Sequence, residues 1–102
     1  MAQFDVHRNP RGGAFPLLLD VQADLLSALA TRVVVPLARA RRWTSKPLTV
    51  LNPIVVVRRV EYVLVFQELA AIPMAALGKP VGSLASRREE LIAALDLLFT
   101  GI

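Results

Sequence analysis

Short runs in which apolar and polar residues alternate cover most of the first three quarters of the chain. In residues 3–7, Phe4 and Val6 fall on one side of an extended backbone, which predicts a strand with both side chains inward. Similar apolar or β-branched runs predict further strands at 17–22, 31–36, 54–57, 61–66 and 72–74. Pro36 is expected to close the third strand, and Pro73 restricts the last one to a short or edge position because proline donates no ladder hydrogen bond.

Turn-forming residues separate these runs. The segment 9–13 has the composition of a loop between the first two strands, 39–47 is a polar connection, and Arg58-Arg59 forms a turn between two strands. Gly78, Pro80 and Gly82 interrupt the pattern before the last segment. Five or six short strands followed by one helix predict a strongly bent antiparallel sheet or small barrel, mainly β in class.

The period changes from two to that of a helix near the end of the chain. Ser86 with Glu89 three residues later has the spacing of a capping box, and Gly101 stands where a helix commonly ends. The predicted helix therefore leaves Thr100, Gly101 and Ile102 as a small projecting tip. One apolar stripe faces the sheet, and it consists of Leu91, Ala94, Leu95 and Leu98. The other apolar residues indicate either a second contact surface or a helix that is buried on most sides.

Length and composition indicate one domain, residues 1–102, with a large apolar fraction. The chain is 55% hydrophobic with a mean hydropathy of +0.53, which favours an oligomer because monomers seldom expose large apolar patches. The longest stretch without charge, 47–57, is too short to cross a bilayer. No basic segment followed by an apolar run stands at the start, so we expect a cytoplasmic protein that does not bind membranes.

The charge balance is basic, with a formal net charge of +4 and a pI of about 10.7. Such a chain favours an acidic partner, either nucleic acid or an acidic peptide. The aromatic residues are few and are not interleaved with the arginines as in single-strand binders. The arginines form three clusters: Arg39, Arg41 and Arg42; Arg58 and Arg59; Arg87 and Arg88.

The residues of common catalytic and metal sites are missing or isolated. The chain has no cysteine and one histidine, His7, which we expect at the surface of its strand. Gly12-Gly13 lacks the lysine of a phosphate-binding loop, and Asp20 with Asp24 lacks further ligands for a metal. The sequence therefore predicts no cofactor, no metal and no enzymatic activity.

Several segments together resemble the CcdB family of toxins from bacterial toxin–antitoxin pairs. No single motif is specific, but their order and spacing cover essentially the whole chain. The matching segments are Gln3-Phe4, 19–22 with 24–26, 32–38, 53–55, Ile72-Pro73, Gly78 and 98–102.

The resemblance implies a fold and a set of partners. Proteins of this family are homodimers with an SH3-like barrel core, a small extra sheet and a C-terminal helix. They are not enzymes; they bind the A subunit of DNA gyrase and trap it with its DNA cleaved. A CcdA-like antitoxin neutralises them through a disordered C-terminal tail, and contact with DNA is expected only indirectly, through the antitoxin complex.

The resemblance also implies site residues. The gyrase-binding positions are Leu25, Leu26, Arg87, Arg88, Asp96, Phe99, Thr100, Gly101 and Ile102. Loose candidates for the antitoxin surface are Arg39, Arg41, Arg42, Arg58 and Arg59. The best-known family pattern has tryptophan where this chain has Thr100 and asparagine where it has Asp96. Threonine cannot stack on an arginine of gyrase, a contact of roughly 0.5–2 kcal/mol, whereas the Asp96 carboxylate can pair with one.

Two alternatives remain open at the level of sequence. One is an endoribonuclease of the MazF/Kid type, with Asp5, His7, Arg8 and Arg11 handling the proton and the phosphate charge. The other is a toxin-like protein that does not kill and only sequesters antitoxin.

Overall fold

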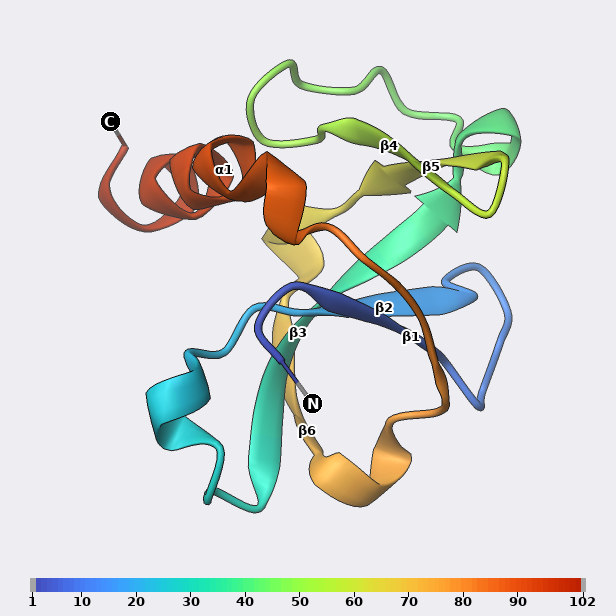
Figure 1. Ribbon diagram of the computed structural model, residues 1–102. Coiled ribbons are helices and arrows are strands. Elements are labelled where there is room, and N and C mark those ends of the chain that lie inside the picture. The colour runs from blue at the N-terminus through green and yellow to red at the C-terminus, as the bar shows by residue number, and fades with distance from the viewer. Residues whose placement is uncertain (1, 102) are drawn as a thin grey trace.

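The computed structural model describes residues 2–101, in which seven strands precede a single α-helix (Figure 1). The strands are β1 (Asp5–Arg8), β2 (Leu17–Asp20), β3 (Thr31–Arg39), β4 (Ile54–Val57), β5 (Val60–Leu64), β6 (Ala70–Pro73) and β7 (Pro80–Ser83), and the helix is α1 (Arg88–Thr100). Short 3-10 turns lie between them: η1 (Asp24–Leu26), η2 (Ala40–Arg42), η3 (Phe66–Glu68), η4 (Met74–Ala76) and η5 (Ala85–Arg87). The predicted class, mainly β with one C-terminal helix, is confirmed.

All strand pairs are antiparallel, and the sheet curls until its two ends meet. The strand order is β4-β5-β3-β2-β1-β7, and β6 pairs with the first half of β3. Although β4 and β7 end this order, Arg58 Nε donates to the carbonyl of Val81 across the gap at 3.0 Å. The expected small extra sheet is a branch of the same sheet, because β6 bonds to β3 beside β5.

The prediction that Pro36 ends the third strand is wrong, because β3 continues through it to Arg39. The backbone carbonyl of Pro36 accepts a bond from the Val65 amide, so its nitrogen faces the same edge. On that edge the pairing with β6 stops at Val34 and the pairing with β5 begins at Leu37. The missing N–H therefore lies between two partner strands, where no ladder bond is lost.

Two more strand predictions need correction. Residues 80–83, expected only to interrupt the pattern, form β7 along β1. The segment before β7 also lies against β1, where the Gly78 amide donates to the Arg8 carbonyl and the Arg8 amide donates to the Lys79 carbonyl. His7, expected at the surface, is 2% exposed beside this segment. Its Nδ1 lies 3.1 Å from the carbonyl oxygen of Gly78. Alternation along a strand identifies its two faces but does not reveal that a distant segment covers the second one.

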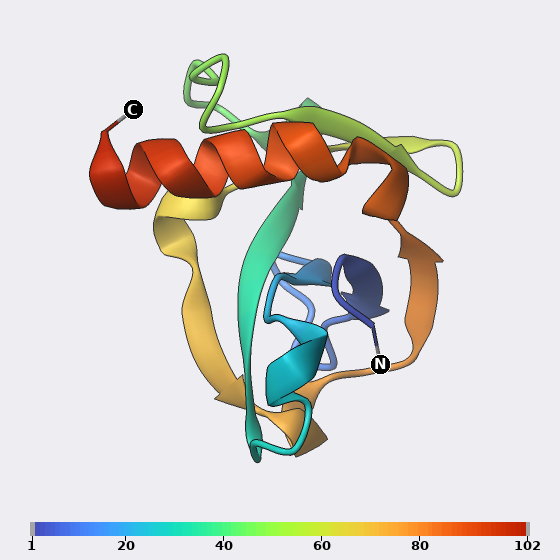
Figure 2. The ribbon, with the colours of Figure 1, turned by 60° about the vertical axis from the view of Figure 1, so that its left-hand side comes forward.

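The core fills the inside of the curled sheet, and α1 lies across one end of it (Figure 2). Leu91 and Ala94 are fully buried, and Leu95 and Leu98 pack against the core at the predicted spacing. The deepest residues outside the helix include Phe4, just before β1, and the strand residues Val6, Leu19, Val35, Leu37 and Leu64. Within residues 2–101, no helix has both the length and the apolar character required to span a membrane.

The predicted capping box at Ser86 is wrong. The N-cap of α1 is Arg87, whose side chain makes no capping bond to the helix, and η5 supplies the preceding turn. The Arg87 guanidinium instead donates to both carboxylate oxygens of Glu90, from Nε at 2.8 Å and from Nη2 at 2.7 Å, and to the carbonyl of Ile54 at 3.0 Å. This arginine therefore ties the start of the helix to β4.

Candidate functional site

The C-terminal end of α1 presents an apolar ring and a carboxylate side by side. Phe99 is 68% exposed although it lies in a helix docked on the core, and Asp96 is exposed one turn before it. The Thr100 hydroxyl donates to the Asp96 carbonyl at 2.7 Å, and Gly101 ends the helix in the left-handed conformation at φ +76°. Helix and cap together give this end a fixed shape. Ile102 lies outside the described residues.

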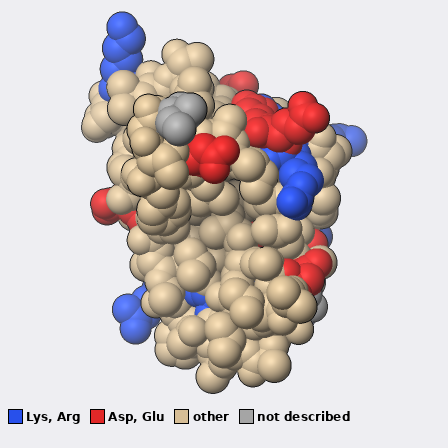
Figure 3. Space-filling model, turned by 90° about the vertical axis from the view of Figure 1, so that its left-hand side faces the viewer, with Lys and Arg blue, Asp and Glu red and all other residues tan. Residues whose placement is uncertain are grey.

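Leu25 and Leu26 lie on η1, away from this helix end. Leu25 is 93% exposed, so η1 presents an apolar side chain to solvent. In both ribbon views the end of α1 lies near the top and η1, drawn in cyan, lies well below it. Figure 3 shows the side from which both project; it is largely uncharged, with charged side chains mainly along its upper part and edges. One protomer therefore does not bring the two leucines and the helix end into one small patch.

Arg87 and Arg88 lie at the opposite end of α1 from Phe99, and both are engaged within the protein. Besides the bonds of Arg87 described above, Arg88 donates to Gln3 Oε1 at 2.9 Å, and its guanidinium carbon lies 5.6 Å from the Phe4 ring centroid. That distance is within the range of a cation–π contact. These two arginines stabilise the start of the helix and the N-terminal segment.

Four arginines of the predicted antitoxin surface gather at the end of β3 and the β4–β5 turn. Arg39 and Arg41 line a hollow with Arg59 and line another with Arg42. Arg58 differs from them, because its side chain holds β7. The fold thus brings together two of the clusters recognised in the sequence and assigns Arg58 to sheet closure.

Comparison with protein-family models gives a match to the CcdB protein family over residues 3–101. The chain belongs to the CcdB family. The match spans nearly the whole chain, and the curled sheet with its terminal helix agrees with it. Membership of the CcdB family makes the protein the toxin of a toxin–antitoxin system.

The geometry around His7 does not favour the ribonuclease alternative to the CcdB family role. A proton-transferring histidine must reach its substrate, but both ring nitrogens of His7 are enclosed: Nδ1 faces Gly78, and Nε2 is buried without a partner in residues 2–101. Asp5 accepts a bond from the Ala2 amide at 3.0 Å. The four residues considered for catalysis therefore do not form an accessible cluster around the histidine.

Two side-chain pairs of this CcdB family member were missed in the sequence. Asp20 and Arg32 form an ion pair with no exposed surface. The only hint of this pair in the sequence was that each predicted apolar strand contains one charged residue. Trp43 packs with Phe15 on the outer face of the sheet, over Ala38, Val63 and Val65. The signal for Trp43 was a lone tryptophan directly after Arg41-Arg42 in a polar connection.

Proposed function

We propose that this protein poisons DNA gyrase by inserting the end of α1 into the A subunit, without catalysing a reaction itself. The observation that carries the proposal is the exposed Phe99 ring at the end of a helix whose side chains Leu91, Ile92, Leu95 and Leu98 lie in or against the core. An exposed aromatic residue on a rigid element has the character of an interface anchor. Gly101 allows the backbone to approach a partner closely.

The polar groups beside Phe99 are expected to set the orientation of the helix end on gyrase. The exposed Asp96 carboxylate is expected to pair with a cation of gyrase, such as an arginine. The Thr100 hydroxyl already donates within its own helix, so the threonine is expected to contribute shape more than a hydrogen bond. Ile102 extends the proposed contact at the helix end, and Leu25 and Leu26 on η1 are proposed as a second, separate apolar contact with gyrase. Arg87 and Arg88 support the helix from its other end.

We further propose that the toxin acts as a homodimer. Within residues 2–101, the large apolar side chains exposed on one protomer are Leu25, Leu26, Leu29, Leu48, Val50, Ile54, Val56, Val60 and Phe99. A two-fold dimer would bury part of this surface and would present two helix ends to a symmetric target. Light scattering at micromolar concentration is expected to give the mass of two chains, and the mass of one chain would contradict this proposal.

An acidic, disordered tail of an antitoxin is the proposed neutralising partner. Arg39, Arg41, Arg42 and Arg59 give it a concentrated positive surface, and association with such a surface depends on salt. Arg58 is left out of this set because its guanidinium bonds to β7.

Cleavage-complex formation tests the function directly. Purified protein is incubated with DNA gyrase, ATP and supercoiled plasmid, and linear DNA is measured after detergent and protease treatment. We expect linear DNA to increase with toxin concentration, and Phe99→Ser to reduce this while keeping the thermal melt of the parent. A parallel incubation with RNA separates the alternatives. RNA cleavage without gyrase-dependent linear DNA would overturn the proposal in favour of an endoribonuclease, and the absence of both activities would overturn it in favour of a protein that only sequesters antitoxin.

A further inference from the structure

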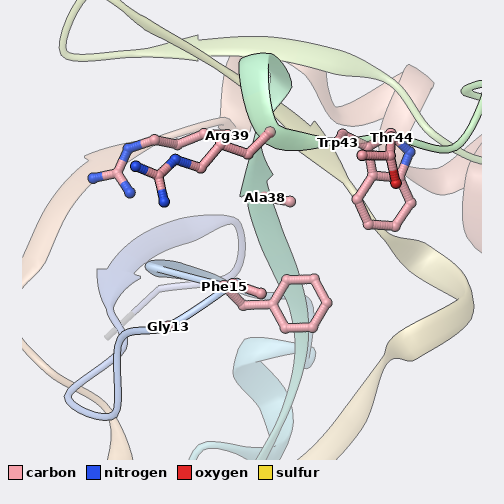
Figure 4. Close-up of a pocket in the computed structure, with 8 residues that line it drawn as sticks. Gly13, Phe15, Ala38, Arg39, Trp43 and Thr44 are labelled. Atoms are coloured by element: carbon pink, nitrogen blue, oxygen red, sulfur yellow. The ribbon is translucent and has the colours of Figure 1, made fainter.

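Phe15 and Trp43 stand between two hollows on the outer face of the sheet. Both side chains line a hollow of about 430 Å³ on the side of Arg39 and Arg42, and both also line one of about 540 Å³ on the side of Lys46. Figure 4 shows the Phe15 and Trp43 rings on one side of the first hollow and the Arg39 side chain extending to the other side. The same two rings border both hollows, and we call the two hollows together the groove.

The groove is built on a fixed floor. Both rings pack on the small cluster formed by Ala38, Val63 and Val65. Asn9 Nδ2 donates to the Phe15 carbonyl at 2.8 Å and anchors the loop that carries this ring. The Trp43 amide donates to the Ala40 carbonyl at 3.3 Å and closes η2. A groove held in this way loses little conformational entropy when a ligand binds.

The chemistry of the groove is apolar in the middle and basic at one end. The described residues that line the first hollow include two arginines and no carboxylate. Arg39 and Arg42 continue from there into a third hollow that they share with Arg41. Trp43 Nε1 is buried and has no acceptor within residues 2–101, so packing on the cluster beneath it holds the indole in place.

We propose that this groove is the docking site for an extended acidic peptide segment that places one aromatic or large aliphatic side chain against Phe15 and Trp43 and its carboxylates against Arg39 and Arg42. The inference rests on the proposed function, because it names the part of the antitoxin tail that the basic surface recognises. Burial of the peptide's apolar side chain against the two rings contributes favourable binding free energy. The guanidinium groups favour peptides that carry carboxylates on one side of that apolar residue.

The lining of the groove favours a peptide over a nucleic acid strand. Glu68 lines the second hollow, and Glu61 lines the hollow of Arg39 and Arg59. A nucleic acid backbone carries a charge at every step and would place phosphates near these carboxylates. A peptide can place neutral residues there and keep its acidic residues beside the arginines.

Trp43 is the only tryptophan of the chain, so its fluorescence reports on the groove directly. The probe is a synthetic peptide without tryptophan, with one phenylalanine flanked by glutamates, and its partner has alanine in place of the phenylalanine. We expect the phenylalanine peptide to change the emission of Trp43 saturably and to bind about tenfold more tightly than the alanine peptide. Equal affinities, or tighter binding of oligothymidine than of either peptide, would overturn the proposal.

Single substitutions test whether the peptide binds in this groove. Arg42→Glu and Phe15→Ala are each expected to raise the Kd of the phenylalanine peptide by about tenfold or more. Arg11→Ala is the control, since it removes an exposed arginine outside the groove, and it is expected to change the Kd by less than about twofold. The thermal melt of each variant shows that it folds. Unchanged affinity in folded Arg42→Glu and folded Phe15→Ala would contradict the proposal.

The same variants separate this inference from the gyrase proposal. Arg42→Glu and Phe15→Ala are expected to form gyrase cleavage complexes as the parent protein does, because their side chains lie outside the proposed gyrase contact. If the parent protein binds the peptide in the groove but does not trap gyrase, the proposed function fails while the docking site stands. If it traps gyrase but the groove variants bind the peptide normally, only the docking site fails.

Discussion

The guanidinium of Arg32 donates to Asp20 Oδ2 from both Nε and Nη2, and neither side chain has exposed surface. The other oxygen of Asp20 accepts the Gln22 amide at 3.0 Å, which fixes the carboxylate. Arg32 lies in the half of β3 that pairs with β6, so this ion pair joins the branch of the sheet to β2. A buried pair of this kind is costly to break because the remaining charge has no water around it.

Removing one charge of this pair is therefore expected to destabilise the fold strongly. We predict that Asp20→Asn lowers the free energy of unfolding by about 3–5 kcal/mol, since it keeps the shape of the side chain but leaves the Arg32 charge buried. Urea denaturation followed by circular dichroism measures the change. Glu61→Gln, at an exposed strand position, is the control and is expected to stay within about 0.5 kcal/mol of the parent. A similar small effect for Asp20→Asn would show that the pair does not stabilise the fold.

Two glycines near β1 are expected to respond differently to a methyl group. A Cβ on Gly78 would lie 2.6 Å from the backbone oxygen of Arg8, whereas one on Gly82 would lie 3.6 Å from Val57 Cγ1. We predict that Gly78→Ala destabilises the protein by about 1–3 kcal/mol because the backbone must shift. Gly82→Ala is predicted to be neutral or slightly stabilising. Thermal melts of the two variants compare them directly, and equal melting temperatures would show that the 77–79 segment adapts freely.

The turn between β4 and β5 carries two arginines in the left-handed region, Arg58 at φ +48° and Arg59 at φ +69°. Side chains disfavour this region by roughly 1–2 kcal/mol per residue, and glycine does not. Arg59→Gly is predicted to stabilise the fold by about 1 kcal/mol while weakening binding of an acidic peptide. Arg58→Gly is expected to gain less stability, because it also removes the bond to Val81. Denaturation and peptide titration measure the two effects, and a loss of stability in Arg59→Gly would contradict the strain argument.

Exposure separates the role of Phe99 from that of the buried helix residues. Phe99→Ser is predicted to change the free energy of unfolding by less than about 1 kcal/mol and to lower gyrase affinity by tenfold or more, as expected for a binding anchor. Leu91→Ala, at a fully buried position, is predicted to cost about 2–5 kcal/mol of stability. Gyrase titration and denaturation of both variants provide the comparison. Full gyrase affinity in Phe99→Ser would exclude the ring from the contact.

Deleting residues 100–102 tests the tip itself. The deletion removes the hydroxyl bond of Thr100 and the bond from the Gly101 amide to the Leu97 carbonyl, so a stability loss of about 1 kcal/mol is expected. Gyrase cleavage complexes are predicted to disappear. Trapping of gyrase at the level of the parent protein would show that the tip is not the site. Loss of the cooperative melt together with activity would show that these residues are structural.

Much of the architecture was predictable because it depends on local pattern. The strands predicted at 17–22, 54–57 and 61–66 lie within two residues of β2, β4 and β5 at each end. The Arg58-Arg59 turn, the inward stripe of α1 and its end at Gly101 also follow from periodicity and turn chemistry. The continuation of β3 through Pro36 did not follow, because it depends on where β6 stops and β5 begins. The capping box failed for a similar reason, since Glu90 and the backbone of β4 hold Arg87 at the helix start.

The sequence by itself determined the class of the fold, the family and the end of the helix, because these depend on neighbours along the chain and on a pattern that spans it. Only the tertiary structure decided which charged residues are partners. In the folded chain Asp20 and Arg32 are buried together, and Arg58, Arg87 and Arg88 make contacts within the protein. The remaining arginines of the clusters line open hollows: Arg39, Arg41, Arg42 and Arg59. The physical reason is that the effect of a charge depends on burial and on groups from distant segments, which become neighbours only when the sheet curls.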